Sequence, residues 1–293
     1  MVRARPCLAY ADAIILMQIN LRATMVSMPL KLIVFTDLDG TFLDHHSYGY
    51  EAAMPALQRL QEDQIPIITV TSKTLAELDH LNLPFGGVAR ITENGMAIEM
   101  PVQGDQKTAQ HHYPSGKTYR DICQFVQSLP SDLRRGLNGF NDMTLQEVMQ
   151  HTGLPEENAA RAKQRMASEP FLWSSDKAAL QQLRDLAAAQ DLQILQGGRF
   201  YHLTGLGGKD HAIGWFLRHQ NIAPDVKTVA LGDGPNDALM LACVDYGIKI
   251  PNASGASFDI PSPQGRIMTA PAEGPKGWSD SLNKLLDEMK LSV

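Results

Sequence analysis

The chain has 293 residues, of which 44% are hydrophobic and 20% are charged, a globular composition that argues against general disorder. At roughly 150 residues per domain, this length predicts about two domains. The net charge of −6, with no basic run, excludes a typical nucleic-acid or anionic-membrane binder. The three cysteines lie far apart without a CxxC pair, so neither a disulfide framework nor a structural zinc site is expected.

Residues 1–28 differ from the rest of the chain. They carry three arginines against one acid, and the apolar stretch Ala13–Met17 is too short for a signal peptide. We expect a disordered or weakly helical extension. No apolar run reaches the roughly 18 residues of a transmembrane helix, so neither a membrane partner nor a compartment other than the cytoplasm is expected.

Strands and helices then alternate. Three apolar runs predict buried parallel strands: Leu30–Thr36, Ile65–Val70 and Val88–Thr92. Helices are predicted over Glu51–Asp63 and after Thr74, which forms a capping box with Glu77. The Asn94-Gly95 pair predicts a turn from which Met96–Met100 returns beside the third strand. This order predicts right-handed crossovers and a doubly wound parallel sheet.

The pattern changes from about Pro101 to Leu203. Four helices are predicted there: Lys117–Leu129, one opening at the Thr144–Glu147 capping box, one after Pro155, and Asp176–Ala189. Gly197-Gly198 predicts a hairpin between Leu192–Gln196 and Arg199–Thr204. Hairpins mixed with helices predict an α+β unit, residues 101–204, inserted into the parallel domain.

The parallel pattern resumes after the insert. Helices and strands are predicted over Asp210–Gln220, Val226–Leu231, Asn236–Val244, Tyr246–Ile250 and Ser281–Leu291. The predicted fold class is therefore α/β: a doubly wound, Rossmann-like core, residues 29–100 and 205–293, with an inserted α+β domain.

Acidic residues follow two of the predicted strands. Asp37 and Asp39 come after the first strand, and their spacing turns both side chains the same way while the chain stays extended. Asp233 and Asp237 follow the strand Val226–Leu231. Carboxylates that converge repel one another unless a cation or shared proton compensates. An Asp-x-Asp pair alone also fits an acidic turn or a metal-binding glycosyltransferase. Because acidic residues also follow a second strand, one site formed by both segments is favoured.

Two further elements suit an anionic ligand. Thr71 follows the second strand, and its hydroxyl and N–H group could hold an anion, although a helix N-cap explains it equally well. Lys209 opens a predicted helix and could neutralise phosphate charge, without matching a Walker A loop. Together with the acids, this set predicts Mg²⁺-assisted phosphoryl transfer.

The motifs resemble those of the haloacid dehalogenase superfamily of phosphatases. All four of its motifs occur in order: Asp37-x-Asp39-x-Thr41, Thr71, Lys209 and Gly232-Asp233-x-x-Asn236-Asp237. The insert resembles a type IIB cap, and Glu93-Asn94-Gly95 is typical of that branch. The strings Gln196–His202 and Glu273–Trp278 resemble those of mannosyl-3-phosphoglycerate phosphatases.

The resemblance implies a role for each motif residue. Asp37 would be the nucleophile, Asp39 the general acid and base, and Thr71 and Lys209 would bind the transferring phosphoryl group. The Mg²⁺ ligands would be Asp37, Asp39 through its carbonyl, Asp233 and, by orienting water, Asp237. Candidate substrate ligands are Lys73, Asn236 and Arg199, the last pairing with a glycerate carboxylate or simply lying at the surface of a hairpin.

The implied function is hydrolysis of a sugar phosphoglycerate through an aspartyl-phosphate. Mannosyl-3-phosphoglycerate is the first candidate substrate, which would yield mannosylglycerate, a compatible solute, and phosphate. The alternatives are another sugar phosphate (glucosyl-3-phosphoglycerate, sucrose phosphate or trehalose phosphate), a phosphohexomutase, or a catalytically inactive binding module. The only partner expected is the small-molecule sugar phosphate.

Overall fold

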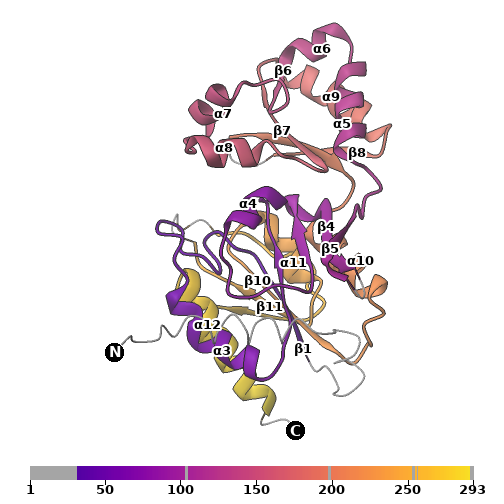
Figure 1. Cartoon of the computed structure of the whole chain (residues 1–293). Coiled ribbons are helices and arrows are strands. Elements are labelled where there is room, and N and C mark those ends of the chain that lie inside the picture. The colour runs from indigo at the N-terminus through magenta and orange to yellow at the C-terminus, as the bar shows by residue number, and fades with distance from the viewer. Residues whose placement is uncertain (1–31, 103–104, 197–198, 253–254, 256, 291–293) are drawn as a thin grey trace.

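The computed structural model describes residues 32–102, 105–196, 199–252, 255 and 257–290. The predicted extension 1–28, the first residues of the first predicted strand and the Gly197-Gly198 turn lie outside the described residues. Figure 1 shows two parts, a larger core and a smaller cap above it. Among the described helices, none combines the length and the apolar content that a membrane span requires.

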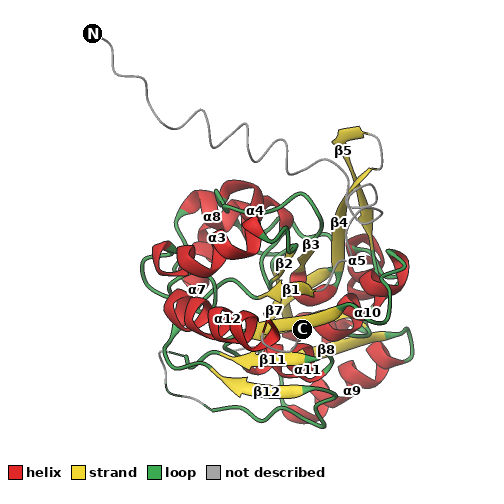
Figure 2. Ribbon diagram, turned by 90° about the horizontal axis from the view of Figure 1, so that it is seen from below, coloured by secondary structure: helices red, strands yellow, loops and turns green. Residues whose placement is uncertain are grey.

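The core is built on an eight-stranded sheet with the strand order β12-β11-β10-β1-β2-β3-β4-β5. The strands are β1 Leu32–Thr36, β2 Ile67–Val70, β3 Arg90–Thr92, β4 Ala97–Val102, β5 Asp105–His112, β10 Lys227–Gly232, β11 Tyr246–Lys249 and β12 Arg266–Thr269. Neighbours from β12 to β3 pair in parallel, and β4 and β5 are antiparallel. Figure 2 shows β5 at one end of the sheet and β12 at the other.

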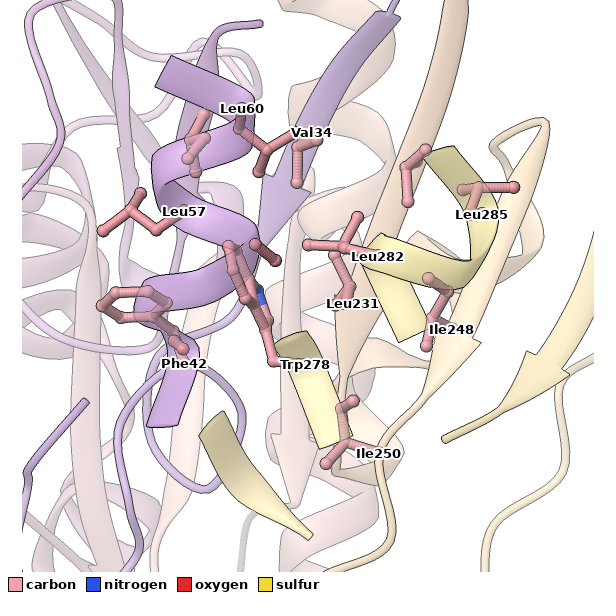
Figure 3. Close-up of a cluster of buried hydrophobic side chains, with 14 of the residues drawn as sticks. Val34, Phe42, Leu57, Leu60, Leu231, Ile248, Ile250, Trp278, Leu282 and Leu285 are labelled. Atoms are coloured by element: carbon pink, nitrogen blue, oxygen red, sulfur yellow. The ribbon is translucent and has the colours of Figure 1, made fainter. Parts of the chain in front are cut away.

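Helices cover both faces of this sheet, as a doubly wound fold requires. They are α3 Met54–Glu62, α4 Leu75–His80, α10 Lys209–His219, α11 Ala238–Ala242 and α12 Gly274–Lys290. Along β1, Val34 packs with α3 and α12 whereas Phe35 packs with α10 and α11, because successive side chains of a strand point to opposite faces. The first of these clusters contains Trp278 and Leu282 of α12 (Figure 3).

The cap has its own antiparallel sheet, with the strand order β6-β7-β9-β8. Its elements are α5 Tyr119–Ser128, α6 Ser131–Gly136, β6 Leu137–Gly139, α7 Leu145–Thr152, α8 Glu156–Ala162, β7 Ser168–Trp173, α9 Lys177–Ala188, β8 Leu192–Gln196 and β9 Tyr201–Gly205. Ile122 of α5 and Leu183 of α9 pack against Phe171 of β7. The predicted fold class, a parallel core with an inserted α+β cap, is confirmed.

The structure differs from the prediction at several strands and at two helices. The insert was predicted to start at residue 101, but β4 runs to Val102 and β5 pairs with β4 in the core sheet. The polar sequence of β5, DQKTAQHH, lacks the apolar alternation by which a strand is recognised. The strands β5, β6, β7 and β12 and the helix α6 were not predicted, and β7 contains Pro170, a residue that is unusual inside a strand. Helix α12 begins at Gly274, seven residues (281 − 274) before the predicted start.

Candidate active site

The carboxyl ends of three neighbouring core strands bring the predicted site residues together. Asp37 follows β1, Thr71 follows β2 and Asp233 follows β10, and β1 lies between the other two strands. Because parallel strands end at the same edge of the sheet, these residues share that edge. Lys209 is the first residue of α10 and reaches the same point.

Lys209 links the two acidic motifs. Its Nζ lies 2.6 Å from Asp37 Oδ1 and 2.6 Å from Asp237 Oδ1, and its side chain is only 1% exposed. Burial alone would lower the pKa of this lysine, but the charges of Asp237 and Asp37 outweigh it and raise the pKa above its usual range. Lys209 is therefore a fixed positive charge between two carboxylates.

The cluster contains three acids, Asp37, Asp233 and Asp237, around the one lysine Lys209. Burial raises the pKa of Asp37 to about 8, against the attraction of Lys209, and the charge of Asp237 adds to the increase. Burial and the repulsion of Asp237 raise the pKa of Asp233 to about 6. Both carboxyl groups therefore hold their protons more tightly than a free acid does, and a bound cation would favour their charged forms.

The donor set fits a hard divalent cation such as Mg²⁺. Asp37, Asp233 and Asp237 each offer a carboxylate oxygen, and these oxygens lie within 4.8 Å of one another. Gly40 leaves room beside them, because a Cβ atom there would lie 2.5 Å from Asp233 Oδ2. Asp237 is already occupied by protein donors: its Oδ2 accepts the N–H groups of Asp233 at 3.1 Å and Gly234 at 3.0 Å. This bonding favours an orienting role for Asp237 and direct coordination by the other two acids.

Asp39 lies next to a lysine of the second motif. Lys73 Nζ is 2.9 Å from Asp39 Oδ2 and 5.2 Å from the centre of the Tyr48 ring. Burial opposes the charge of Lys73, but Asp39 raises the pKa of the lysine above its usual value. The other carboxylate oxygen, Oδ1, is buried and has no hydrogen-bond partner within the described part of the chain. One oxygen of Asp39 is thus held while the other is uncommitted.

The remaining predicted residues occupy different places. Thr71 is fully buried, and its hydroxyl accepts the N–H group of Lys73 at 3.2 Å. Asn236 donates its side-chain amide to Asn94 Oδ1 at 3.3 Å. Arg199 lies exposed on the cap and donates to the backbone carbonyl of His151, so its pairing with a substrate carboxylate stays a prediction.

Two residues around the cluster were not assigned a role from the sequence. Thr41 donates to Asp233 Oδ1 at 3.4 Å, and its place in the Asp-x-Asp-x-Thr pattern was the signal for it. Asn252 donates to the backbone carbonyl of Asp233 at 3.1 Å, and no local pattern marked it. Both residues hold the loop that carries Asp233.

Comparison with known proteins identifies the class. Residues 34–196 match the haloacid dehalogenase-like hydrolase family, and the chain belongs to that family. Over 272 residues it is 35% identical to a glucosyl-3-phosphoglycerate/mannosyl-3-phosphoglycerate phosphatase of Persephonella marina, covering 88% of this chain and 98% of that protein. The predicted family and the prediction of a hydrolase are confirmed.

Solved structures share the fold at lower sequence identity. A haloacid dehalogenase-like hydrolase of B. subtilis superposes with a TM-score of 0.60 at 18% identity, covering 87% of this chain and 100% of that chain. A second one, from Bacteroides thetaiotaomicron, gives a TM-score of 0.56 at 15% identity, with coverage of 87% and 99%. Both likenesses extend over the core and the cap.

Proposed function

We propose that this hydrolase is a Mg²⁺-dependent phosphatase that removes phosphate from a sugar 3-phosphoglycerate. The observation that carries the proposal is the buried ion-paired cluster in which Lys209 joins Asp37 and Asp237 beside Asp233. Mannosyl-3-phosphoglycerate is the first candidate substrate, and glucosyl-3-phosphoglycerate is the second. The Persephonella marina relative, which carries both substrates in its name, supports this choice.

The first chemical step would form an acyl-phosphate on Asp37. An oxygen of the Asp37 carboxylate attacks phosphorus, the bond from phosphorus to the glycerate oxygen breaks, and Asp39 donates its proton to that leaving oxygen. Lys209 holds the attacking carboxylate at 2.6 Å. A Mg²⁺ ion bound by Asp37, Asp233 and the carbonyl of Asp39 would supply positive charge to the phosphate oxygens.

The second step would return Asp37 to its free form. The Asp39 carboxylate takes a proton from a water molecule, the water oxygen attacks phosphorus, and the bond between phosphorus and the Asp37 oxygen breaks. Lys73, 2.9 Å from Asp39 Oδ2, holds one oxygen of this carboxylate in place during the step. The uncommitted Asp39 Oδ1 is the atom that would exchange the proton.

A phosphate-release assay tests the proposal. The chain is incubated with Mg²⁺ and with mannosyl-3-phosphoglycerate, glucosyl-3-phosphoglycerate, sucrose phosphate or trehalose phosphate. We expect fastest release from mannosyl-3-phosphoglycerate and none in excess chelator. Preference for sucrose or trehalose phosphate would refute the substrate assignment. An isomerised sugar phosphate without free phosphate would indicate a mutase instead.

A further inference from the structure

Glu93 carries a buried carboxylate outside the acidic cluster. It opens the 3-10 turn η2, Glu93–Gly95, between β3 and β4, and its side chain is fully buried. A carboxylate in such a position is costly unless donors surround it. The groups that donate hydrogen bonds to this carboxylate therefore indicate its structural role.

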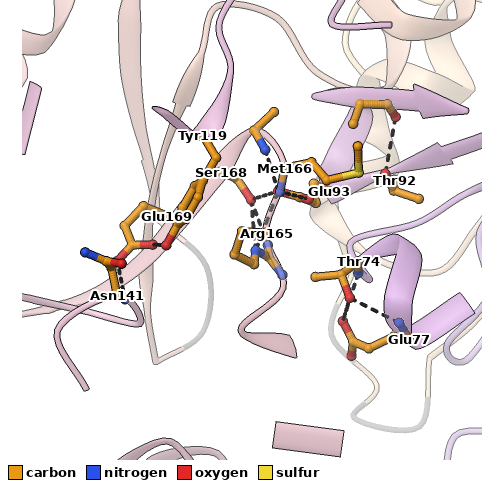
Figure 4. Close-up of polar contacts among 12 residues, drawn as sticks. Thr74, Glu77, Thr92, Glu93, Tyr119, Asn141, Arg165, Met166, Ser168 and Glu169 are labelled. Atoms are coloured by element: carbon orange, nitrogen blue, oxygen red, sulfur yellow. Dashed lines mark hydrogen bonds and ion pairs between the residues drawn. The ribbon is translucent and has the colours of Figure 1, made fainter. Parts of the chain in front are cut away.

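Four consecutive residues of the cap bind this carboxylate (Figure 4). Oε1 accepts the N–H group of Met166 at 2.7 Å, and Oε2 accepts the N–H group of Ala167 at 3.2 Å. Oε2 also accepts the hydroxyl of Ser168 at 2.6 Å and lies 3.6 Å from Arg165 Nε. The segment that leads into β7 thus forms a cradle for one side chain of the core.

The backbone of the same turn contacts the predicted phosphate-binding residues. The N–H group of Glu93 donates to the carbonyl of Lys73 at 3.0 Å, and that of Asn94 donates to the carbonyl of Thr71 at 2.9 Å. Asn94 Oδ1 also accepts the amide of Asn236 at 3.3 Å. One turn therefore touches two of the four motifs.

The turn is conformationally strained and must be held by its surroundings. Glu93, Asn94 and Gly95 have φ values of 52°, 57° and 93°, a left-handed run that is unfavourable for residues other than glycine. A Cβ atom on Gly95 would lie 2.3 Å from the carbonyl oxygen of Gly208, the residue before Lys209. The turn is thus also pressed against the start of α10, which carries the third motif.

We propose that Glu93 is a positioning residue. Through its carboxylate, the cap segment 165–168 holds Thr71, Lys73 and Asn236 in place around the phosphate. The cap donors fix the carboxylate, the carboxylate fixes the strained turn, and the turn fixes the loops that carry these three side chains. The kinetic test of this role rests on the proposed function, because it requires that the protein is a phosphatase. The cap then acts on the reaction even for a substrate too small to contact it.

The test uses Glu93→Gln, which keeps the size of the side chain but removes its charge and one acceptor oxygen. With an aryl phosphate as substrate, we expect kcat to fall about ten- to hundredfold, with a smaller change in KM, because small misplacements of reacting groups cost this much. Glu99→Gln is the matched control, since Glu99 is a half-buried core acid paired with Arg90 at 2.5 Å. Its kcat should stay within about twofold of wild type.

Amide hydrogen exchange supplies a second readout that does not depend on activity. In Glu93→Gln, and more weakly in Ser168→Ala, the amides of residues 71–74, 93–95 and 166–168 should exchange faster than in wild type. Ser168→Ala leaves the core sequence intact and serves if Glu93→Gln fails to fold. Wild-type kcat or wild-type exchange at residues 71–74 in the folded variants would overturn the positioning role. A wild-type chain without phosphatase activity would refute the proposed function. The exchange data would still show whether Glu93 couples the cap to residues 71–74.

Discussion

At the scale of single residues, the site depends on charges that compensate one another inside the protein. Lys209 Nζ contacts Asp37 and Asp237 at 2.6 Å each, and all three side chains are nearly inaccessible. Removing one partner of such a group leaves the others buried and uncompensated, which costs more than the pairing contributes. Substitutions that keep the shape of a side chain are therefore the informative ones here.

The two neighbouring aspartates should behave differently when changed to asparagine. Asp37→Asn removes the attacking charge, so we expect almost no turnover and no phosphorylated protein. Asp39→Asn keeps the nucleophile but loses proton transfer, which is worth about 10² to 10⁴ in rate. With an aryl phosphate, whose leaving group needs little protonation, the acyl-phosphate should form and then persist.

Intact mass after a brief quench with substrate measures this difference. Wild type without substrate is the control. A phosphorylated species in Asp37→Asn, or a phosphoryl group mapped to Asp39, Thr71 or Ser72, would contradict the assignment of the nucleophile.

The sequence predicted the positions of some residues near the site but not the contacts of others. Asp37 and Asp233 directly follow apolar strands, so the geometry of a parallel sheet was enough to place them together. The carboxylate of Glu93 binds a segment 73 to 75 residues further along the chain, and no local pattern encodes such a contact. Contacts between core and cap depend on tertiary packing that spacing does not report.

At the scale of elements, α12 ties the C-terminal part of the chain to the strand that leads to Asp37. Trp278 is fully buried, and its ring centre lies 5.2 Å from that of Phe42. Its indole N–H group donates to Thr36 Oγ1 at 3.0 Å, and Thr36 in turn donates to the carbonyl of Asp37 at 2.7 Å. The start of α12 was missed because Gly277 disfavours a helix interior, whereas Pro275 in the first turn is tolerated there, and the burial of Trp278 outweighs the cost of the glycine.

Trp278→Phe should lower the free energy of unfolding by about 1–3 kcal/mol. The change removes the indole hydrogen bond and leaves a small cavity among Phe42 and the leucines of α12. Urea unfolding followed by circular dichroism measures the difference. Leu239→Ala, at a residue that is 52% exposed, is the control and should change stability by less than about 0.5 kcal/mol. Equal midpoints for wild type and Trp278→Phe would contradict the role given to this tryptophan.

At the scale of the whole molecule, the acidic cluster joins two segments of chain that the cap separates. Asp37 lies before the cap in sequence, and Asp233 and Asp237 lie after it. A ligand that binds all of them binds only the folded core. Metal binding should therefore raise the free energy of unfolding of the entire core.

Mg²⁺ should raise the free energy of unfolding measured in chelator. At a free Mg²⁺ concentration 100 times the dissociation constant, the increase should be about 2.7 kcal/mol, because only the native state binds the ion. Urea unfolding in chelator and in Mg²⁺ measures it. Asp233→Asn should abolish most of the increment, whereas Asp245→Asn, at an acid paired with Lys227 away from the cluster, should retain it. Equal stability of wild type in both buffers would exclude the ion from this site.

The position of β1 between β2 and β10 has a consequence for synthesis on the ribosome. β2 follows β1 within the same stretch of chain, but β10 begins only at Lys227, after the cap has been translated. The four cap strands pair with one another and are continuous in sequence, so the cap can fold while one edge of β1 still awaits its neighbour. Asp37 consequently meets Lys209 and Asp233 only late in translation, and a nascent chain that ends inside the cap carries Asp37 without the other residues of the cluster.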